Sequence, residues 1–435
     1  MTSPRFCTLK LLMRMSDNAY SNLLLDNSLE SEEFDVRDKK FISTLFYGVI
    51  ERKLTLDHII SKYKPLNKID NDILCVLRMG IYQLLYMSSI PDNAAVNESV
   101  NLVKQLRKTS AAGFVNAILR NFIRDDKKID LSDDKIERMS IEYSCPEWLV
   151  KMWLEQYGEK NTENILKSTV SKPEIAIRVN TIKITSDDLI KMLEDEGITA
   201  EKHNMSENCL VLNNSGAIEK LESFRNGLFH VQDMSSQLCC KALNPSETDI
   251  VLDLCAAPGG KSFTLAELMN NKGTIYSCDL HEKRVNLIKS GAERLGITNI
   301  KFMTNNAKEY NSELPLADKI LCDVPCAGLG VISKKPEIKY KSENEISSLP
   351  KIQYEILKTA SKYLKIGGEL VYSTCSLNKE ENDDVIDTFL NENKNYEGVT
   401  LLEDIKKSSD GYKMTIFPDD FNSDGFFISK IRRIK

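Results

Sequence analysis

The sequence predicts a multidomain protein: an all-α N-terminal domain, a small α+β module and a C-terminal α/β domain with a parallel sheet. Three observations predict this fold class. The length of 435 residues exceeds what a single core usually serves. Apolar residues recur at helical spacing early in the chain, whereas strand-like and helix-like segments alternate from residue 249 onward. We place the domain boundaries at 1–143, 144–240 and 241–435.

The composition is that of a folded protein in a reducing compartment. Hydrophobic residues make up 42% of the chain and charged residues 28%. No apolar run approaches bilayer length and no signal-peptide pattern opens the chain, so we expect a cytoplasmic protein without a membrane segment. The eleven cysteines lack zinc-type spacing, which predicts reduced thiols and no metal. A net charge of −6 argues against general coating of nucleic acid but permits a local basic groove.

Two amphipathic stripes predict the N-terminal helices. NDILCVLRMGIYQLLYM, residues 71–87, follows an acidic cluster suited to helix capping, and SAAGFVNAILRNFIRD, residues 110–125, repeats the spacing. Pattern alone indicates only that these helices pack together. RDDKKIDLSDDK, residues 124–135, is predicted to be the first linker.

The two regions after residue 143 combine helix-like and strand-like segments in different ways. The middle module combines the helical EWLVKMWLEQYG and DDLIKMLEDEG with the strand-like EIAIRVN, CLVLN and LFHVQD. The last domain instead alternates regularly, which predicts a parallel sheet with helices on both faces. Its strand candidates are IVLDLCA, GTIYSCD, NIKFMT, DKILCD and GELVYSTC, and its helix candidates are residues 261–271, 281–295 and 347–365.

The turn after the first strand of this domain is predicted to be a ligand cradle. Small residues let backbone amides approach a ligand at the carboxyl end of a strand, where a helix also begins. A Walker loop would need Gly where Cys255 stands, and no GxGxxG is present, so a nucleoside without a pyrophosphate fits best. The cradle residues are Cys255, Ala256, Ala257, Pro258, Gly259, Gly260 and Lys261.

Two carboxylates narrow the choice of ligand. Asp279 ends the next strand, where it can accept hydrogen bonds from ribose, and Asp253 ends the first. Acidic groups repel phosphate but can bind the hydroxyls of a ribose and a cationic amino-acid tail. S-adenosylmethionine has both of these groups. A solvated strand end or a helix cap is the alternative reading of Asp279.

Two cysteines at neighbouring strand ends indicate covalent chemistry. Cys326 lies in LCDVPCAGLGVI and Cys375 in LVYSTCSLNKEEN. A thiolate that adds to C6 of a pyrimidine makes C5 nucleophilic toward a methyl donor, and Asp323 could assist at N3 of the ring. Methylation of an exocyclic nitrogen is the rival, but its sites carry an aromatic residue where Cys326 stands. Small residues that merely fill space are the other alternative.

DLCAAPGGK, DVPCAGLG, STCSLNKEEN and DGFF together resemble the RNA cytosine-C5 methyltransferases of the NOL1/NOP2/Sun family. The resemblance implies a Rossmann-like class I methyltransferase domain that uses S-adenosylmethionine. It implies that Cys375 is the nucleophile and that Cys326 helps release the product, whereas DNA cytosine methyltransferases reverse these roles. It also maps the cofactor loop onto Cys255–Lys261 and a further cofactor contact onto Asp323. Asn306 replaces the family's adenine-contacting Asp.

The resemblance extends upstream. The early helices resemble a NusB-like RNA-binding domain, and IRVNT (177–181) and VQDMSSQ (231–237) resemble the family's RNA-binding module. The implied substrate is a cytosine of 16S ribosomal RNA, free or in an incompletely assembled small subunit, and we expect a monomer. An RNA-binding assembly factor with a vestigial methyltransferase domain is the alternative function.

A basic stretch follows the Asp323 loop and is predicted to contact RNA. An unpaired or flipped base needs cationic groups around its flanking backbone. ISKKPEIKYK, residues 332–341, could supply them, and a solvated lysine-rich loop is the alternative. The predicted RNA-contacting residues are Lys334, Lys335 and Lys339, with Arg178 and Asn180 as weaker candidates.

Overall fold

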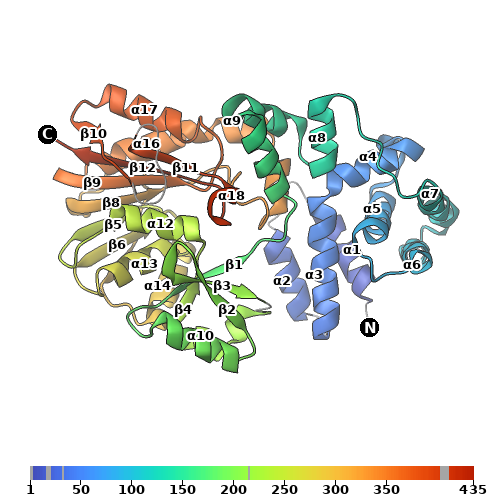
Figure 1. The fold of residues 1–435 in the computed structure, drawn as a ribbon, viewed down its shortest axis with the longest axis horizontal. Helices are drawn as coiled ribbons and strands as arrows, with labels where there is room; N and C mark the ends of the chain where they lie inside the picture. The colour runs from blue at the N-terminus through green and yellow to red at the C-terminus, as the bar shows by residue number, and fades with distance from the viewer. Residues whose placement is uncertain (1–2, 16–20, 32–33, 214–215, 402–410) are drawn as a thin grey trace. The chain divides into compact units, whose positions relative to one another are not determined.

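The computed structural model describes residues 3–15, 21–31, 34–213, 216–401 and 411–435, and the chain divides into two compact units. One unit, here called the helical unit, comprises Met1–Lys172 and Ile332–Ser342. The other, here called the sheet unit, comprises Pro173–Val331 and Glu343–Lys435. Figure 1 draws the helical unit mostly in blue and dark green and the sheet unit in light green to red. None of the helices described here is long and apolar enough to cross a membrane.

The helical unit contains the two predicted stripes as helices α5 and α7. Asp70 caps α5, because its carboxylate accepts hydrogen bonds from the backbone amides of Asp72 and Ile73. Apolar side chains of both helices, including Leu77 and Leu119, are fully buried in one core. The helices are α1 Pro4–Arg14, α2 Ser21–Ser31, α3 Val36–Glu51, α4 Lys53–Tyr63, α5 Asn71–Tyr86, α6 Asp92–Gln105, α7 Ala112–Arg124, α8 Lys135–Tyr143 and α9 Glu147–Ser168.

Two segments join this unit that the sequence placed elsewhere. Helix α9, expected in the middle module, packs on α8 and buries Leu149, Val150 and Trp153. Residues 332–342 also pack with these helices and form a short 3-10 helix, Pro336–Tyr340. Sequence spacing cannot show either result, because both depend on which surface a segment finds in the folded chain.

The middle module is a four-stranded antiparallel sheet of order β2-β3-β1-β4. Its elements are β1 Ile175–Val179, α10 Ser186–Asp195, β2 Thr199–His203, β3 Ser206–Asn213, α11 Glu222–Arg225 and β4 Phe229–Val231. Helix α10 covers the sheet and buries Leu189 and Leu193 in a separate small core. Helix α12, Met234–Leu243, then leads to the main sheet.

The main sheet has the order β10-β12-β9-β8-β5-β6-β7, with β11 paired to β12. Strands β5 to β9 run parallel, as predicted, and β12 joins antiparallel to β9. The strands are β5 Ile250–Asp253, β6 Thr274–Asp279, β7 Ile300–Thr304, β8 Ala317–Asp323, β9 Leu364–Thr374, β10 Tyr396–Gly398, β11 Lys413–Ile416 and β12 Phe426–Arg433. The helices are α13 Gly260–Leu268, α14 Glu282–Leu295, α15 Glu343–Ser347, α16 Leu349–Ser361, α17 Asp383–Glu392 and α18 Pro418–Phe421.

Successive residues of the central strands face two different cores. Val251 and Leu321 pack in the core that includes α12, α13 and α14, whereas their neighbours Leu252 and Ile320 pack in the core that includes α16 and α17. This alternation follows from the two-residue period of a strand. The sheet is therefore covered by helices on both faces, as the alternating sequence predicts.

Candidate active site

The carboxyl ends of the parallel strands place the predicted residues along one edge of the main sheet. Asp253, Asp279 and Asp323 are the last residues of β5, β6 and β8, and Cys375 directly follows β9. Strands β6 and β8 flank β5 on opposite sides, so the order reverses at β5. A crevice of this kind is where ligands bind in open α/β sheets.

The predicted cradle connects β5 to α13. Gly259 has φ 113°, and a Cβ atom there would collide with the Phe263 ring, so only glycine fits. The Ala257–Pro258 peptide bond is cis. Ala256 is buried and donates its amide to Cys278 O at 2.8 Å, which ties the cradle to β6. Cys255 is half-buried, and burial raises the pKa of its thiol, so this thiol is a neutral part of the wall.

Asp253 carries an unsatisfied acceptor at the base of the cradle. Its side chain is fully buried, and Oδ2 accepts a hydrogen bond from Ser262 Oγ at 2.7 Å. Among the described residues Oδ1 has no hydrogen-bond partner, and burial raises the pKa of this carboxyl to about 7. A buried acceptor without a donor is costly. The cradle therefore fits a ligand that brings hydrogen-bond donors, as a nucleoside with an ammonium tail does.

Asp279 and Asn306 lie where adjacent strands end. Oδ2 of Asp279 is 3.3 Å from Arg284 Nη1, and Arg284 Nη2 also donates to Ala257 O at 2.9 Å. Arg284, which the sequence did not single out, thus links the ribose candidate to the cradle. Asn306 follows β7 and is half-buried, with its amide oxygen accepting from the Lys308 amide and its nitrogen donating to Glu309.

Asp323 and Lys261 form an ion pair at this edge. The Lys261 Nζ atom is 2.7 Å from Asp323 Oδ2, and Ser373 Oγ donates to Asp323 Oδ1 at 2.8 Å. Burial is the largest single influence and would lower the pKa of Lys261, but the Asp323 carboxylate together with Cys239 and Cys240 outweighs it and raises that pKa above its ordinary value. The ammonium also lies 5.2 Å from the centroid of the Phe426 ring, which belongs to the DGFF motif.

The two candidate cysteines meet. Cys326 Sγ and Cys375 Sγ are 3.3 Å apart, and both side chains are half-buried, so neither is sealed inside the core. The hydrogen bond between the two thiols lowers the pKa of Cys375, and the Lys261 ammonium acts in the same direction. The same contact, together with burial, raises the pKa of Cys326 well above its ordinary value. Cys375 is thus the better thiolate and Cys326 the better proton donor.

Backbone contacts hold the loops that carry these thiols. Gly330 donates its amide to Cys375 O at 2.9 Å, and Gly425 donates to Gly330 O at 2.9 Å. A Cβ atom at Gly330 would collide with Gly425 O, so both glycines permit this close approach. Gly425 lies in DGFF, a motif that the sequence identifies without indicating what it contacts.

Two residues predicted to contact RNA are internal instead. Arg178 is only 7% exposed, and its guanidinium pairs with Glu267 at 2.8 Å. Asn180 is fully buried and donates to Gly227 O and Leu295 O, each at 2.8 Å. Their charge and hydrogen bonds hold the module on the main sheet, so the structure does not support the predicted contact with phosphate.

Lys339 requires the same correction. Its side chain is fully buried in the helical unit, where Nζ donates to Glu51 O at 2.7 Å. The adjacent Tyr340 hydroxyl donates to Ile50 O at 2.7 Å. Lys334 and Lys335, by contrast, are exposed. An alternating stretch such as KKPEIKYK gives no sign of which lysines turn inward, because the α3 carbonyl groups that receive them are remote in sequence.

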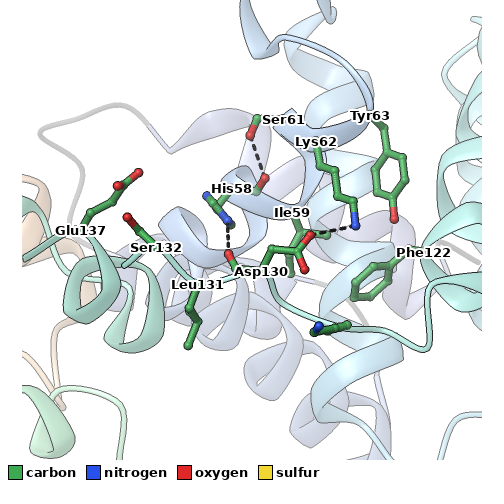
Figure 2. A pocket seen from close by; sticks show the side chains of 11 residues that line it. His58, Ile59, Ser61, Lys62, Tyr63, Phe122, Asp130, Leu131, Ser132 and Glu137 are labelled. Carbon is green, nitrogen blue, oxygen red and sulfur yellow. Dashed lines mark hydrogen bonds and ion pairs between the residues drawn. The ribbon is translucent and has the colours of Figure 1, made fainter. Parts of the chain in front are cut away.

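The helical unit also has a hollow of about 350 Å³ (Figure 2). It is lined by His58, Ile59, Ser61, Lys62, Tyr63, Phe122, Lys128, Asp130, Leu131, Ser132 and Glu137. Lys62 pairs with Asp130 at 2.9 Å, and the His58 ring bonds to Asp130 O at 2.7 Å. Because these groups satisfy one another, we assign this hollow no role.

The sheet order, the glycine-lined cradle and the acidic strand ends define a Rossmann-like methyltransferase. The chain matches three families: "16S rRNA methyltransferase RsmB/F" over residues 240–432, the "NusB family" over residues 2–124, and the "Methyltr_RsmF/B-like, ferredoxin-like domain" over residues 145–219.

Relatives match over the whole length. A probable ribosomal RNA small subunit methyltransferase B from Bacillus subtilis (strain 168) is 38% identical over 99% of both chains. A protein of the same description from Synechocystis sp. (strain ATCC 27184 / PCC 6803 / Kazusa) is 31% identical over 96% of both. The solved structure of PH0851 has a TM-score of 0.83 at 25% identity and covers 99% of this chain and 98% of that one. The chain belongs to the ribosomal RNA small subunit methyltransferase B family, within the Sun/NOP2 group.

Proposed function

We propose that this protein transfers a methyl group from S-adenosylmethionine to C5 of a cytosine in 16S ribosomal RNA. The observation that carries the proposal is the pair of half-buried thiols, 3.3 Å apart, at the strand ends beside a cradle with an unsatisfied carboxylate. Nitrogen methylation needs no thiol, so the cysteine pair favours carbon. The name of the family supports ribosomal RNA as the substrate.

The cradle Cys255–Lys261 and two carboxylates would hold the cofactor. Asp253 offers its free Oδ1 atom to an ammonium, and Asp279 offers acceptors to ribose hydroxyls. Asn306 lies just after β7, the next strand of the sheet, and would contact the adenine of the cofactor. When bound, S-adenosylmethionine supplies an electrophilic methyl group.

Cys375 would act as the nucleophile. Its thiolate adds to C6 of the cytosine, which places electron density at C5 and makes that carbon reactive toward a methyl cation equivalent. Asp323 contacts the N3 side of the ring and stabilises the adduct by hydrogen bonding. Lys261 holds Asp323 in place and favours the Cys375 thiolate through its positive charge.

Cys326 would act after methyl transfer. The methylated adduct still carries a proton at C5, and its removal lets the bond between Cys375 and C6 break. In the free enzyme the two thiols share a hydrogen bond, and the raised pKa of Cys326 keeps the proton on that sulfur. Once Cys375 is bonded to carbon its negative charge is gone, so Cys326 would release this proton to solvent and, as a thiolate, take the proton from C5. Both thiols then return to their starting state.

The substrate base must leave its stack to reach this edge. Lys334 and Lys335 are exposed and would bind RNA phosphates, whereas Arg178, Asn180 and Lys339 are not retained. We propose that the NusB-like helices and the ferredoxin-like module also bind rRNA. Free 16S rRNA or an incompletely assembled small subunit is the proposed substrate, acted on by a cytoplasmic monomer.

Methyl transfer to purified 16S rRNA, located by bisulfite sequencing, tests this function. The intact protein should modify one cytosine, and Cys375→Ala should abolish the product. Cys326→Ala should accumulate a protein–RNA adduct that survives a denaturing gel, because release is blocked.

Cys75→Ala is the matched control, since Cys75 is also half-buried but lies in α5. It should transfer methyl groups like the unchanged protein. An adduct that forms only in Cys375→Ala would reverse the two roles. Binding of rRNA without any methyl transfer would favour an assembly factor instead.

A further inference from the structure

One buried carboxylate connects the two loops that carry the cysteine pair. Glu381 lies between β9 and α17, outside the reacting atoms, and is fully buried. Its Oε2 atom accepts a hydrogen bond from the Ala327 amide at 2.8 Å, and its Oε1 atom accepts from Ser376 Oγ at 2.6 Å. Ala327 directly follows Cys326 and Ser376 directly follows Cys375. Each oxygen therefore holds one of the two loops.

A second donor reinforces each oxygen. Gln353 Nε2, on α16, donates to Glu381 Oε2 at 2.9 Å and to Pro325 O at 3.0 Å, so it grips the Cys326 loop on the other side of the cysteine. Asn378 Nδ2 donates to Oε1 at 3.4 Å. Four donors thus converge on one carboxylate. Hydrogen bonds to an ionised acceptor are shorter and stronger than neutral ones, which suits a group that must fix two loops at once.

The backbone around Glu381 is fixed as well. The hydroxyl of Tyr372, a fully buried residue of β9, donates to Glu381 O at 2.6 Å. Asn382 Nδ2 donates to Ser376 O at 2.8 Å, and Asn382 Oδ1 accepts from Thr374 Oγ1 at 2.5 Å. Because hydrogen bonds hold both the backbone and the side chain of Glu381, its carboxylate has a fixed position. It can therefore limit the movement of the two loops that carry the thiols.

We propose that Glu381 is a positioning residue that holds Cys326 and Cys375 at the distance their chemistry requires. The proposal rests on the function proposed above for the two thiols. A buried carboxylate costs stability unless each of its oxygens accepts hydrogen bonds. Its presence between the two cysteine loops therefore favours a role in holding them. Loss of Glu381 should slow both steps that depend on the pair while leaving the cofactor cradle intact.

The distance between the thiols can be measured without activity. Diamide, a diazene oxidant, takes up the two thiol hydrogens and becomes a hydrazine as the bond between the two sulfurs forms. The rate at which this disulfide forms in the full-length protein, measured by peptide mass spectrometry, reports how often the two sulfurs meet. The unchanged protein should form it rapidly, and Glu381→Ala should form it about tenfold more slowly.

Glu380→Gln is the matched control. Glu380 is the exposed neighbour of Glu381, so this change removes the same charge one residue away. It should leave the diamide rate and methyl transfer unchanged. Glu381→Gln should fall between the two, because an amide has one acceptor and can satisfy the Ala327 amide or the Ser376 hydroxyl but not both.

Methyl transfer and cofactor binding complete the test. Single-turnover transfer should fall about 100-fold in Glu381→Ala, whereas the Kd for S-adenosylhomocysteine measured by calorimetry should stay within about twofold. Should Glu381→Ala not fold, Ser376→Ala removes a single bond and should show a smaller effect of the same kind. A folded Glu381→Ala or Ser376→Ala protein that joins the cysteines at the unchanged rate would overturn the proposal. Because the diamide measurement needs no RNA, it stays informative even if the proposed reaction is wrong.

Discussion

Lys261 and Lys339 are both largely withdrawn from solvent, one at the strand ends of the sheet unit and the other in the helical unit. The Lys261 side chain is 13% exposed and contacts the Asp323 carboxylate, whereas Lys339 is 0% exposed and donates to the Glu51 carbonyl group. The pKa of Lys261 is raised, while burial lowers the pKa of Lys339 to about 8. The partner, not the depth of burial, decides whether a buried ammonium keeps its proton.

The difference separates an ammonium that is paired with a carboxylate from an ammonium that is hydrogen-bonded to a carbonyl group. At Lys261 the ion pair maintains a cation beside Cys375 at every ordinary pH. At Lys339 a neutral carbonyl offers a hydrogen bond but little compensation for lost hydration, so the charge carries a cost. Substitution of Lys261 should therefore affect methyl transfer, whereas substitution of Lys339 should affect stability.

Lys261→Met should have the largest effect. It leaves the Asp323 carboxylate without its partner and removes a positive charge that lowers the pKa of Cys375. We expect methyl transfer to fall by about 100-fold to 1,000-fold, the range for removal of one electrostatic group from an active site. Single-turnover assays on 16S rRNA measure it.

Lys272→Met is the matched control, because the exposed Lys272 pairs with Glu247 just beyond α13. It should transfer methyl groups at the unchanged rate. Equal activity of both variants would show that the ion pair with Asp323 has no part in the reaction.

Lys339→Met should instead change how stability depends on pH. The folded pKa of about 8 lies below the unfolded value, so between these pH values only the unfolded state holds the proton. The cost of the buried charge is therefore fully present below pH 8 and is relieved as pH rises toward about 10.4, a change of roughly 3 kcal/mol. The Lys339→Met variant should not show this increase in the free energy of unfolding with pH.

Urea unfolding followed by tryptophan fluorescence measures it, because both tryptophans, Trp148 and Trp153, lie in α9 of the helical unit. Nearby Cys145, Glu51 and Arg52 are present in both proteins, so the difference isolates Lys339. Parallel stability curves for the two proteins between pH 7 and 10 would contradict the expectation.

The alkylation rate of Cys375 should also distinguish Lys261 from Lys339, with a smaller effect than the two tests above. Its lowered pKa predicts that iodoacetamide modifies it at a lower pH than an ordinary thiol, about tenfold faster than Cys326 at neutral pH. Lys261→Met should move the Cys375 profile to higher pH, and Lys339→Met should not. Peptide mass spectrometry after timed quenching gives each rate. Faster modification of Cys326 would reverse the assignment of the thiolate.

The smallest effect is expected at the exposed lysines. Lys334→Ala and Lys335→Ala should each weaken rRNA binding a few-fold and reduce the slope of affinity against salt by about one. Filter binding at several salt concentrations measures both. Lys362→Ala, at the exposed end of α16 before β9 begins, is the control and should change neither quantity. An unchanged slope in all three variants would remove these lysines from the RNA surface.

The sequence predicts the five parallel strands β5 to β9 and the residues at their carboxyl ends, because a strand-turn-helix pattern is local, but it does not predict the order of strands in the sheet or the added strands β10, β11 and β12. Cys326, Cys375 and Asp323 could be assigned to one edge for that reason. Their partners could not: Ser373 and Arg284 contact the site across strands or helix turns that carry no distinctive spacing. Sheet register brings Ser373 to Asp323, and the start of α14 brings Arg284 to Asp279, and only the folded chain defines both.

Long-range packing accounts for the other differences. Lys339 and Arg178 resemble surface cations in sequence, yet each meets a buried partner from a distant segment, Glu51 O and Glu267 respectively. Glu381 lies within STCSLNKEEN, but nothing in that motif shows that its carboxylate also binds the amide of Ala327. Burial and pairing of charged groups are tertiary properties.

Strand β12 has a consequence for how the enzyme is made. It pairs with β9 up to the residue before Cys375, with Phe427 opposite Thr374, and its neighbour Gly425 holds the Gly330 loop. Among the described strands of the sheet it is translated last. The nascent chain can therefore fold its cradle early but must wait for this strand before the thiol loops are secured, and we expect the growing polypeptide to be catalytically silent until then.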